Sequence, residues 1–275
     1  MKKKILALLL AGCMAAGLCA CGTPAADSGT GDTSGTTATA DGDTVVIGVF
    51  EPLTGDNGAG GKQEYLGMQY ANSITPEVTI GDKTYKVELS VVDNESSNDK
   101  AVSAASQLIS QNVSIVLGSY GSGVSIAASD TFGEAGVPAM GVTCTNPQIT
   151  EGNDHYFRIC FLDPYQGKIL AVFAAQDLKA KKAAILYDVS SDYSHGLREF
   201  FIKSFKAAGG TIVADEGHRG EDVDFRAQLT KIKLSNPDVL VLPTMGKCTP
   251  LSVKQAREMG IDVPIIGGDG YGGFM

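Results

Sequence analysis

Short apolar runs alternate with longer amphipathic segments from Thr44 to the end of the chain. Runs such as TVVIGVF (44–50) and VSIVLG (113–118) are continuous and rich in β-branched residues, which is typical of strands covered on both faces. Between these runs, residues 98–111 repeat apolar positions at the spacing of one helix face. The pattern predicts an α/β protein in which parallel sheets are flanked by helices.

The same alternation predicts the individual elements. The predicted strands are residues 44–50, 85–93, 113–118, 137–142, 181–188, 211–216, 237–243 and 263–268. The predicted helices are residues 62–74, 98–111, 124–136, 194–210, 224–236 and 251–260. Pro164 and the glycine-rich stretch 265–273 mark two crossings between sheets. We therefore predict a lobe at 44–161 and a lobe at 162–267, joined by a hinge, with residues 268–275 returning toward the first lobe.

The N-terminus, MKKKILALLLAGCMAAGLCAC, has three lysines followed by an apolar stretch too short to span a membrane. We interpret residues 1–20 as a lipoprotein signal peptide, because the LCA before Cys21 resembles the lipobox of bacterial lipoproteins. Cys13, in LAGC, is the alternative lipidation site, and a cleaved signal without lipid is a further alternative. Residues 21–43 are mostly Gly, Ser, Thr, Ala and Asp, which predicts a flexible linker. The predicted location is extracytoplasmic, anchored to the bacterial cell membrane.

Charge and cysteine content exclude several classes of function. The chain has 22 basic and 31 acidic residues and a net charge of -9, which argues against binding nucleic acid. Beyond the signal, Cys144, Cys160 and Cys248 lack the paired spacing of a zinc or redox site. We expect no metal and no cofactor.

The stretch LGSYGSGVSIAAS (117–129) joins a strand to a helix through a glycine-rich turn. A nucleophile elbow would need glycines two residues either side of Ser122, where Tyr120 and Val124 stand. A phosphate loop in residues 55–63 fails because Gln follows Gly-Lys. A carboxylate site remains, since N–H groups at a helix start favour an anion. A simple tight turn is the alternative.

Two other turns extend this interpretation. MGVTCTNPQIT (140–150) places hydroxyl groups after the next strand, and Asp269 lies between glycines at the presumed hinge. An acid at that position would neutralise an ammonium group. On composition alone these turns could also be purely structural.

Six segments, among them IGVFEPLTGDNGAGGKQEYLGMQYA, VVDNESSNDKAVSAASQLISQ and KQAREMGIDVPIIGGDGY, are similar in sequence and order to the Leu/Ile/Val-binding protein family. Members of this family are the extracytoplasmic substrate-binding subunits of branched-chain amino-acid ABC transporters. The resemblance covers nearly all of residues 44–275 and implies the two-lobed type I periplasmic-binding-protein fold.

The resemblance also implies a set of ligand contacts. Ser122 would hold the ligand carboxylate, Thr145 would touch both ends of the amino acid, and Thr143 would offer its carbonyl to the ammonium. Asp269 would pair with the ammonium, and Tyr193 would close over the ligand from the second lobe. The predicted ligand-binding residues are Gly121, Ser122, Thr143, Cys144, Thr145, Tyr193 and Asp269.

Two features depart from the family. Relatives often have aromatic residues at the positions of Gly60 and of Met245 or Gly246, so we expect a larger or differently shaped side-chain pocket. Tyr120 and Tyr271 are candidates to replace those aromatic residues. The chain also ends at Met275, where family members continue, so we expect a truncated chain that lacks the last βα units of both lobes.

The resulting prediction is a monomeric, lipid-anchored binding protein, not an enzyme, that captures an amino acid for the membrane permease of an ABC transporter. The alternatives are a ligand-sensing domain, a binder of amides or other small carboxylates and, from another class, a secreted α/β enzyme.

Overall fold

The predicted alternation of strands and helices forms two sheets in the computed structural model, which describes residues 42–274. The first sheet has six strands in the order β2-β3-β1-β4-β5-β6. Their bounds are β1 Thr44–Glu51, β2 Glu77–Ile80, β3 Lys83–Asp93, β4 Ile115–Leu117, β5 Ala139–Gly141 and β6 Tyr156–Arg158. All neighbouring pairs are parallel except β2 and β3.

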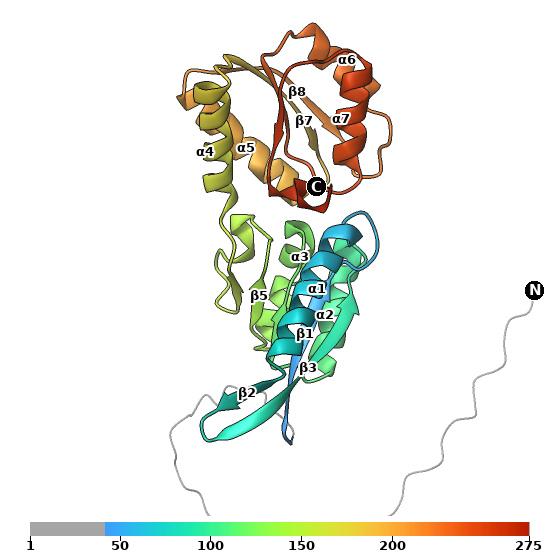
Figure 1. The fold of residues 1–275 in the computed structure, drawn as a ribbon, viewed down its shortest axis with the longest axis vertical. Helices are drawn as coiled ribbons and strands as arrows, with labels where there is room; N and C mark the ends of the chain where they lie inside the picture. The colour runs from blue at the N-terminus through green and yellow to red at the C-terminus, as the bar shows by residue number, and fades with distance from the viewer. Residues whose placement is uncertain (1–41, 275) are drawn as a thin grey trace, which may run out of the picture. The chain divides into compact units, whose positions relative to one another are not determined.

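Helices cover the first sheet because its apolar strands present side chains on both faces. Helices α2 (Asn98–Ser110) and α3 (Ser122–Glu134) pack together over one face, and α1 (Gly58–Ile74) packs against β1 (Figure 1). The core under α2 and α3 contains Phe50, Phe132 and Tyr156, whose rings meet edge to face. Parallel strands with both faces covered are the arrangement that the sequence predicts.

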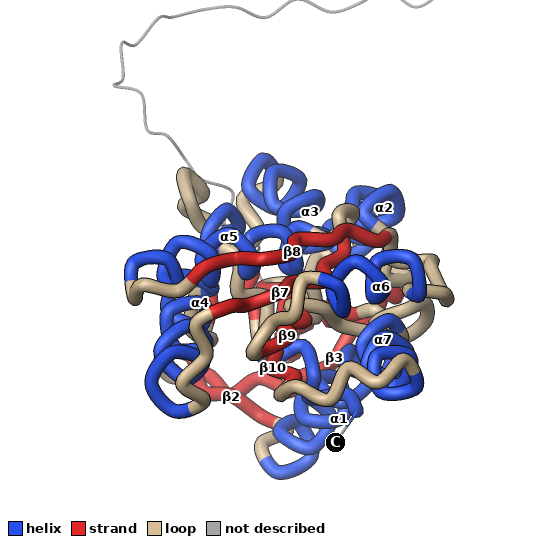
Figure 2. Tube along the Cα trace, turned by 90° about the horizontal axis from the view of Figure 1, so that it is seen from above, coloured by secondary structure: helices blue, strands red, loops and turns tan. Residues whose placement is uncertain are grey.

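The second sheet has four parallel strands in the order β10-β9-β7-β8, which lie side by side in Figure 2. The strands are β7 Lys182–Asp188, β8 Thr211–His218, β9 Val239–Leu242 and β10 Ile265–Gly267. Ala183 and Ile185 of β7 pack in one apolar cluster, and Ala184 and Leu186 pack in another. Because successive side chains of a strand point to opposite faces, this sheet has a core on each side.

Four helices cover those two faces. They are α4 (Asp163–Val172), α5 (Asp192–Ala207), α6 (Arg226–Leu234) and α7 (Cys248–Glu258). The cluster with Phe201 and Phe205 lies under α4 and α5, and the cluster with Leu229 and Ala256 lies under α6 and α7. The fold class predicted from the sequence, parallel sheets flanked by helices, is therefore confirmed.

The hairpin of β2 and β3 differs from the predictions, because it adds an antiparallel strand. Val78 and Ile80 alternate with polar residues, but the run has only four residues and all four are exposed, so no buried face marks it as a strand. Asp93, the last residue of β3, orders a neighbouring loop. Its Oδ1 accepts hydrogen bonds from the N–H groups of Leu53 and Thr54 and so fixes the loop after β1.

Some predictions lie elsewhere. The signal peptide, the linker before residue 42 and the lipidation sites Cys21 and Cys13 lie outside the described residues. Within residues 42–274, no helix combines the length and the apolar character needed to cross a bilayer. The division into lobes at residues 161 and 267 stays a prediction.

Replacing Phe132 with alanine should lower the free energy of unfolding by about 3–5 kcal/mol, because the fully buried ring leaves a cavity. Phe157→Ala is the matched control, since that ring is 49% exposed. Urea unfolding followed by circular dichroism measures both variants. Equal losses would contradict the assignment of Phe132 to the core.

Candidate functional site

The turn that opens α3 has the features of an anion site. Helix α3 begins at Ser122, two residues before the start of the predicted segment 124–136, and its N-cap Gly121 has a φ of 108°, a conformation that favours glycine. Gly121 has no side chain to cap the first N–H groups of the helix, so these groups and the helix dipole favour a negative charge. The Ser122 hydroxyl accepts a hydrogen bond from Asn146 N at 3.2 Å. Its own hydrogen is therefore available to an acceptor.

Asp269 begins the short helix η3 (Asp269–Phe274) directly after β10. Its Oδ1 accepts hydrogen bonds from the Tyr193 hydroxyl at 2.8 Å and from Gln166 Nε2 at 3.0 Å. Gln166 also accepts a hydrogen bond from Asp269 N at 2.6 Å, which fixes the residue from a second direction. Burial raises the pKa of Asp269, while the hydrogen bonds from Tyr193 and Gln166 oppose that rise. The carboxyl group of Asp269 is therefore held in one position by Tyr193 and Gln166, which lie on helices of the second sheet.

Ser122 and Asp269 meet in one cavity of about 170 Å³. Engineered protein cavities of about 150 Å³ hold a molecule the size of benzene. The described residues that line it come from helices and loops beside both sheets, and none of them is lysine or arginine. They are Gly60, Gln63, Glu64, Tyr120, Gly121, Ser122, Thr143, Tyr193, Met245, Asp269, Gly270 and Gly272. Five predicted ligand-binding residues are thus together: Gly121, Ser122, Thr143, Tyr193 and Asp269.

Cys144 and Thr145 are placed differently. Both are completely buried and neither lines this cavity. Burial raises the pKa of Cys144 to about 12, which makes it a neutral packing residue. Thr145 is a neighbour of Asp163 and lowers the pKa of its carboxyl group, against the larger effect of burial. Direct ligand contact by these two residues stays a prediction.

Glu64 is a lining residue that the sequence analysis missed. It lies on α1, and the Thr143 hydroxyl donates a hydrogen bond to its Oε1. Thr143 therefore directs its side chain to an acid, which leaves its backbone carbonyl for any ligand contact. The available signal was the position of Glu64, almost two turns into the helix that follows the carboxyl end of β1. The periodicity of apolar residues carries no information about such a polar position.

Tyr120 occupies the space that Gly60 leaves open. A Cβ atom placed on Gly60 would lie 2.6 Å from Cε1 of the Tyr120 ring, so the glycine and the tyrosine fit together. Tyr271 instead packs over Gly267 and donates a hydrogen bond to Leu242 O, away from the cavity lining. Of the two candidate replacements for the missing aromatic residues, Tyr120 is the one in the cavity.

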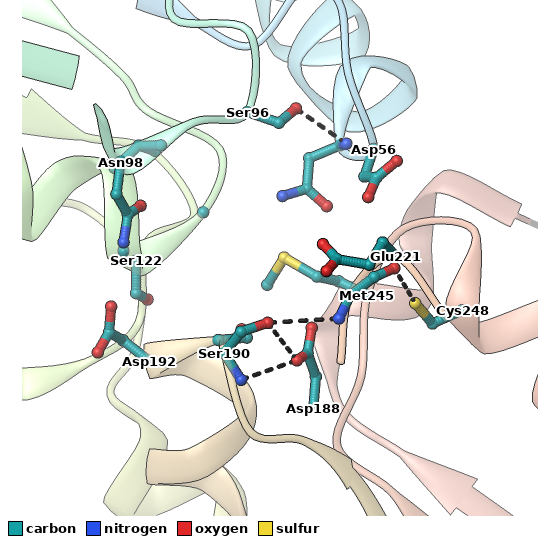
Figure 3. Close-up of a pocket in the computed structure, with 16 residues that line it drawn as sticks. Asp56, Ser96, Asn98, Ser122, Asp188, Ser190, Asp192, Glu221, Met245 and Cys248 are labelled. Atoms are coloured by element: carbon teal, nitrogen blue, oxygen red, sulfur yellow. Dashed lines mark hydrogen bonds between the residues drawn. The ribbon is translucent and has the colours of Figure 1, made fainter. Parts of the chain in front are cut away.

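A second cavity, of about 230 Å³, adjoins the first through Gly121, Ser122 and Met245. Figure 3 shows four acids around it: Asp56, Asp188, Asp192 and Glu221. Within residues 42–274, no basic residue lines this cavity. An anionic extension of a ligand would therefore be repelled from this side of Ser122.

Direct contacts join the loops of the two sheets around these cavities. Lys247 Nζ lies 2.8 Å from Asp56 Oδ1, and Asn146 Nδ2 donates a hydrogen bond to Asp192 O at 3.0 Å. The ion pair is about half exposed, so it contributes little to stability. These contacts define a closed arrangement in which residues of both sheets surround the same space.

Two α/β sheets that share a small-molecule cavity at the carboxyl ends of their strands define the class of two-lobed ligand-binding proteins. A model of the periplasmic binding protein family matches residues 44–274. The chain belongs to this family, and the predicted resemblance to Leu/Ile/Val-binding proteins is confirmed.

Individual relatives agree with this assignment. A "Leu/Ile/Val-binding protein homolog 3" from Brucella melitensis is 30% identical over 82% of this chain and 61% of its own length. The branched-chain amino acid transporter substrate-binding protein LivJ from Streptococcus pneumoniae, solved with isoleucine, is 37% identical with a TM-score of 0.75. This comparison covers 83% of this chain and 65% of that one.

A solute-binding protein of an ABC transporter from Rhodopseudomonas palustris, solved with 3,4-dihydroxybenzoic acid, is 26% identical with a TM-score of 0.73. This comparison covers 82% of this chain and 62% of the Rhodopseudomonas palustris protein. The chain thus spans less than two thirds of the length of these relatives.

Buried acids around the cavity should make stability fall as the pH rises. Burial raises the pKa of Asp163, at the start of α4, to about 6, and it also raises the pKa values of Glu51, Glu64 and Asp269. A group whose folded pKa lies above its unfolded value binds more protons in the folded state between the two values. The free energy of unfolding should therefore decrease from about pH 5 to pH 7.

Scanning calorimetry between pH 5 and pH 7 tests this expectation. Asp163→Asn should raise the melting temperature at pH 7 by a few degrees and flatten its pH dependence. Asp154→Asn, at an exposed position, is the control. A melting temperature that rises from pH 5 to pH 7 would contradict the prediction.

Proposed function

We propose that this chain binds a free amino acid with an apolar side chain, branched-chain amino acids first, as the substrate-binding subunit of an ABC transporter. The observation that carries the proposal is the meeting of Ser122, at the start of α3, with the fixed Asp269 carboxylate in one cavity. The first site suits a carboxylate and the second suits an ammonium group.

The absence of basic lining residues narrows the choice of ligand. A carboxylate without an ammonium group would satisfy Ser122 but would leave Glu64 and Asp269 desolvated beside an apolar group. An amino acid supplies the positive charge that these acids require. The isoleucine of the Streptococcus pneumoniae relative has both charges, whereas the dihydroxybenzoic acid of the Rhodopseudomonas palustris relative has only the carboxylate.

The rest of the cavity suits an apolar side chain. Gly60, Tyr120, Met245, Gly270 and Gly272 contribute lining without charge, and the Tyr120 ring fills the space over Gly60. The adjoining acidic cavity disfavours an anionic side chain. Branched-chain amino acids therefore fit the cavity better than aspartate or glutamate.

The remaining parts of the proposal rest on the family resemblance. Residues 44–161 and 162–267 would act as lobes that close over the ligand by bending at their crossings. Residues 1–43 would supply the signal, the lipidated Cys21 and a tether, which places the protein outside the cytoplasm. The chain would carry no catalysis of its own and would present its ligand to a membrane permease.

Calorimetric titration of the purified protein tests the proposal. The panel is isoleucine, leucine, valine, aspartate and 3,4-dihydroxybenzoate. We expect binding of the branched-chain amino acids and no binding of the last two. Binding of dihydroxybenzoate in preference to every amino acid would refute the assignment.

Asp269→Asn should weaken amino-acid binding by about 2–5 kcal/mol, because it removes the charge that faces the ammonium group and keeps the shape of the residue. Ligands without an ammonium group should lose nothing. Titration of isoleucine and of its deaminated 2-keto analogue compares the two effects. Asp262→Asn, at an exposed position nearby in sequence, should leave both affinities unchanged.

Ser122→Ala should weaken carboxylate ligands by about 1–3 kcal/mol through the loss of one hydrogen bond to a charged group. The backbone N–H group of Asn146 also loses its acceptor in this variant. Melting temperatures of the ligand-free proteins are therefore measured as well, to separate a loss of stability from a loss of affinity. Ser103→Ala on the exposed face of α2 is the control. Unchanged affinity for isoleucine in Ser122→Ala would remove this residue from the site.

A further inference from the structure

Glu51 is a fully buried acid at the carboxyl end of β1. Its Oε2 accepts a hydrogen bond from Tyr120 N at 2.8 Å, and its Oε1 is buried without a conventional donor. A Cβ on Gly118 would lie 2.5 Å from this Oε1, so the turn before α3 passes directly over the carboxyl group. Glu51 therefore supports the loop that leads to Ser122.

Glu64 has the complementary arrangement on the other side. Its Oε1 accepts the hydrogen bond of the Thr143 hydroxyl, and its Oε2 is buried without a conventional donor. The two carboxyl groups are close enough to act on each other, since Glu64 raises the pKa of Glu51 and Glu51 lowers that of Glu64. Two neighbouring ionised carboxylates would repel, because a carboxylate only accepts hydrogen bonds, whereas one added proton would let one group donate to the other.

Among the described residues, Asp269, Tyr120, Tyr156, Cys144 and Cys160 interact electrostatically with the pair, and none of these five is a cation. Arg158 acts on Cys144 and Cys160, but its guanidinium donates hydrogen bonds to the carbonyl groups of Cys144 and Asn146 and to the Thr150 hydroxyl. Burial raises the pKa of Glu51 most, with the neighbouring Glu64 charge second, and burial raises the pKa of Glu64 as well. Two buried carboxyl groups in contact retain one proton between them, as in other carboxyl dyads.

We propose that Glu51 and Glu64 share one proton at neutral pH and that this proton links the two ligand-facing loops. One end of the pair holds Tyr120 N, two residues before Ser122, and the other end holds the Thr143 hydroxyl after β5. The proton satisfies Oε1 of Glu51 and Oε2 of Glu64 at once. Both residues are positioning residues, and only Glu64 also lines the cavity.

The pair also provides a proton that a ligand could displace. An ammonium group near Glu64 and Asp269 favours the charged forms of both acids, so its binding should release part of the shared proton. This consequence rests on the proposed function, whereas the shared proton itself does not.

Infrared difference spectroscopy at pH 8 tests the shared proton without any ligand. The parent should show a protonated carboxyl C=O band that is absent from Glu51→Gln. That variant should stay folded, because its amide can donate to Glu64 and accept from Tyr120 N. Glu64→Gln is the second variant and should also remove the band, while Glu77→Gln, exposed on β2, should keep it. A parent spectrum without such a band, or with a band that both glutamine variants retain, would overturn the proposal.

Melting temperatures separate a shared proton from simple packing. Glu51→Gln should melt at or above the parent temperature at pH 8, and Glu51→Ala should melt well below it. Equal destabilisation by both substitutions would overturn the role of the proton.

Titration of isoleucine in two buffers of different ionisation enthalpy measures the coupling to ligand. The parent should release more protons at pH 8 than Glu51→Gln, by up to one proton per ligand. Equal release would overturn the coupling of the pair to the cavity. An absence of isoleucine binding to the parent would instead refute the proposed function, and the infrared result would still decide whether the proton is present.

Discussion

Burial of carboxyl groups without a basic partner is the constraint on which the site depends. An ionised carboxylate removed from water must be neutralised, hydrogen-bonded or protonated. Asp269 is hydrogen-bonded, because its carboxyl group accepts hydrogen bonds from Tyr193 and Gln166. Glu51 and Glu64 each keep one buried oxygen without a donor, and the shared proton that we propose would satisfy both. These acids are costly to keep charged, and in the proposed function the ammonium group of the ligand would supply the missing positive charge.

The same constraint gives folding and binding opposite dependences on pH. Protonation of Asp163 and of the cavity acids favours the folded chain, because each of them has a raised pKa. An ammonium ligand requires the ionised form of Asp269. Stability without ligand and affinity for ligand therefore favour different protonation states of one set of residues. Such opposition is expected where residues are retained for binding and not for stability.

Much of the fold could be predicted because the apolar runs of both sheets are continuous. Ser122 and Asp269 could be predicted because glycines beside them mark turns at the ends of strands, where ligands bind in parallel sheets. Glu64 could not, since a polar residue on a helix shows no period that separates a cavity wall from a solvated face. Strand β2 was missed because its alternating run is only four residues long and all four are exposed, so its apolar residues mark no buried face. The complete burial of Cys144 and Thr145 depends on how the turn after β5 packs, and the local sequence does not predict that packing.

The position of Tyr120 joins the electrostatic part of the site to its shape. Its N–H group is held by Glu51, and its ring fills the space over Gly60 in the cavity wall. The residue two positions later is Ser122, the predicted partner of the ligand carboxylate. A change in the carboxyl pair would therefore move an aromatic wall and a hydrogen-bond donor together. Since packed loops shift between discrete arrangements and do not deform smoothly, charge and pocket shape at this site are set by one structural element.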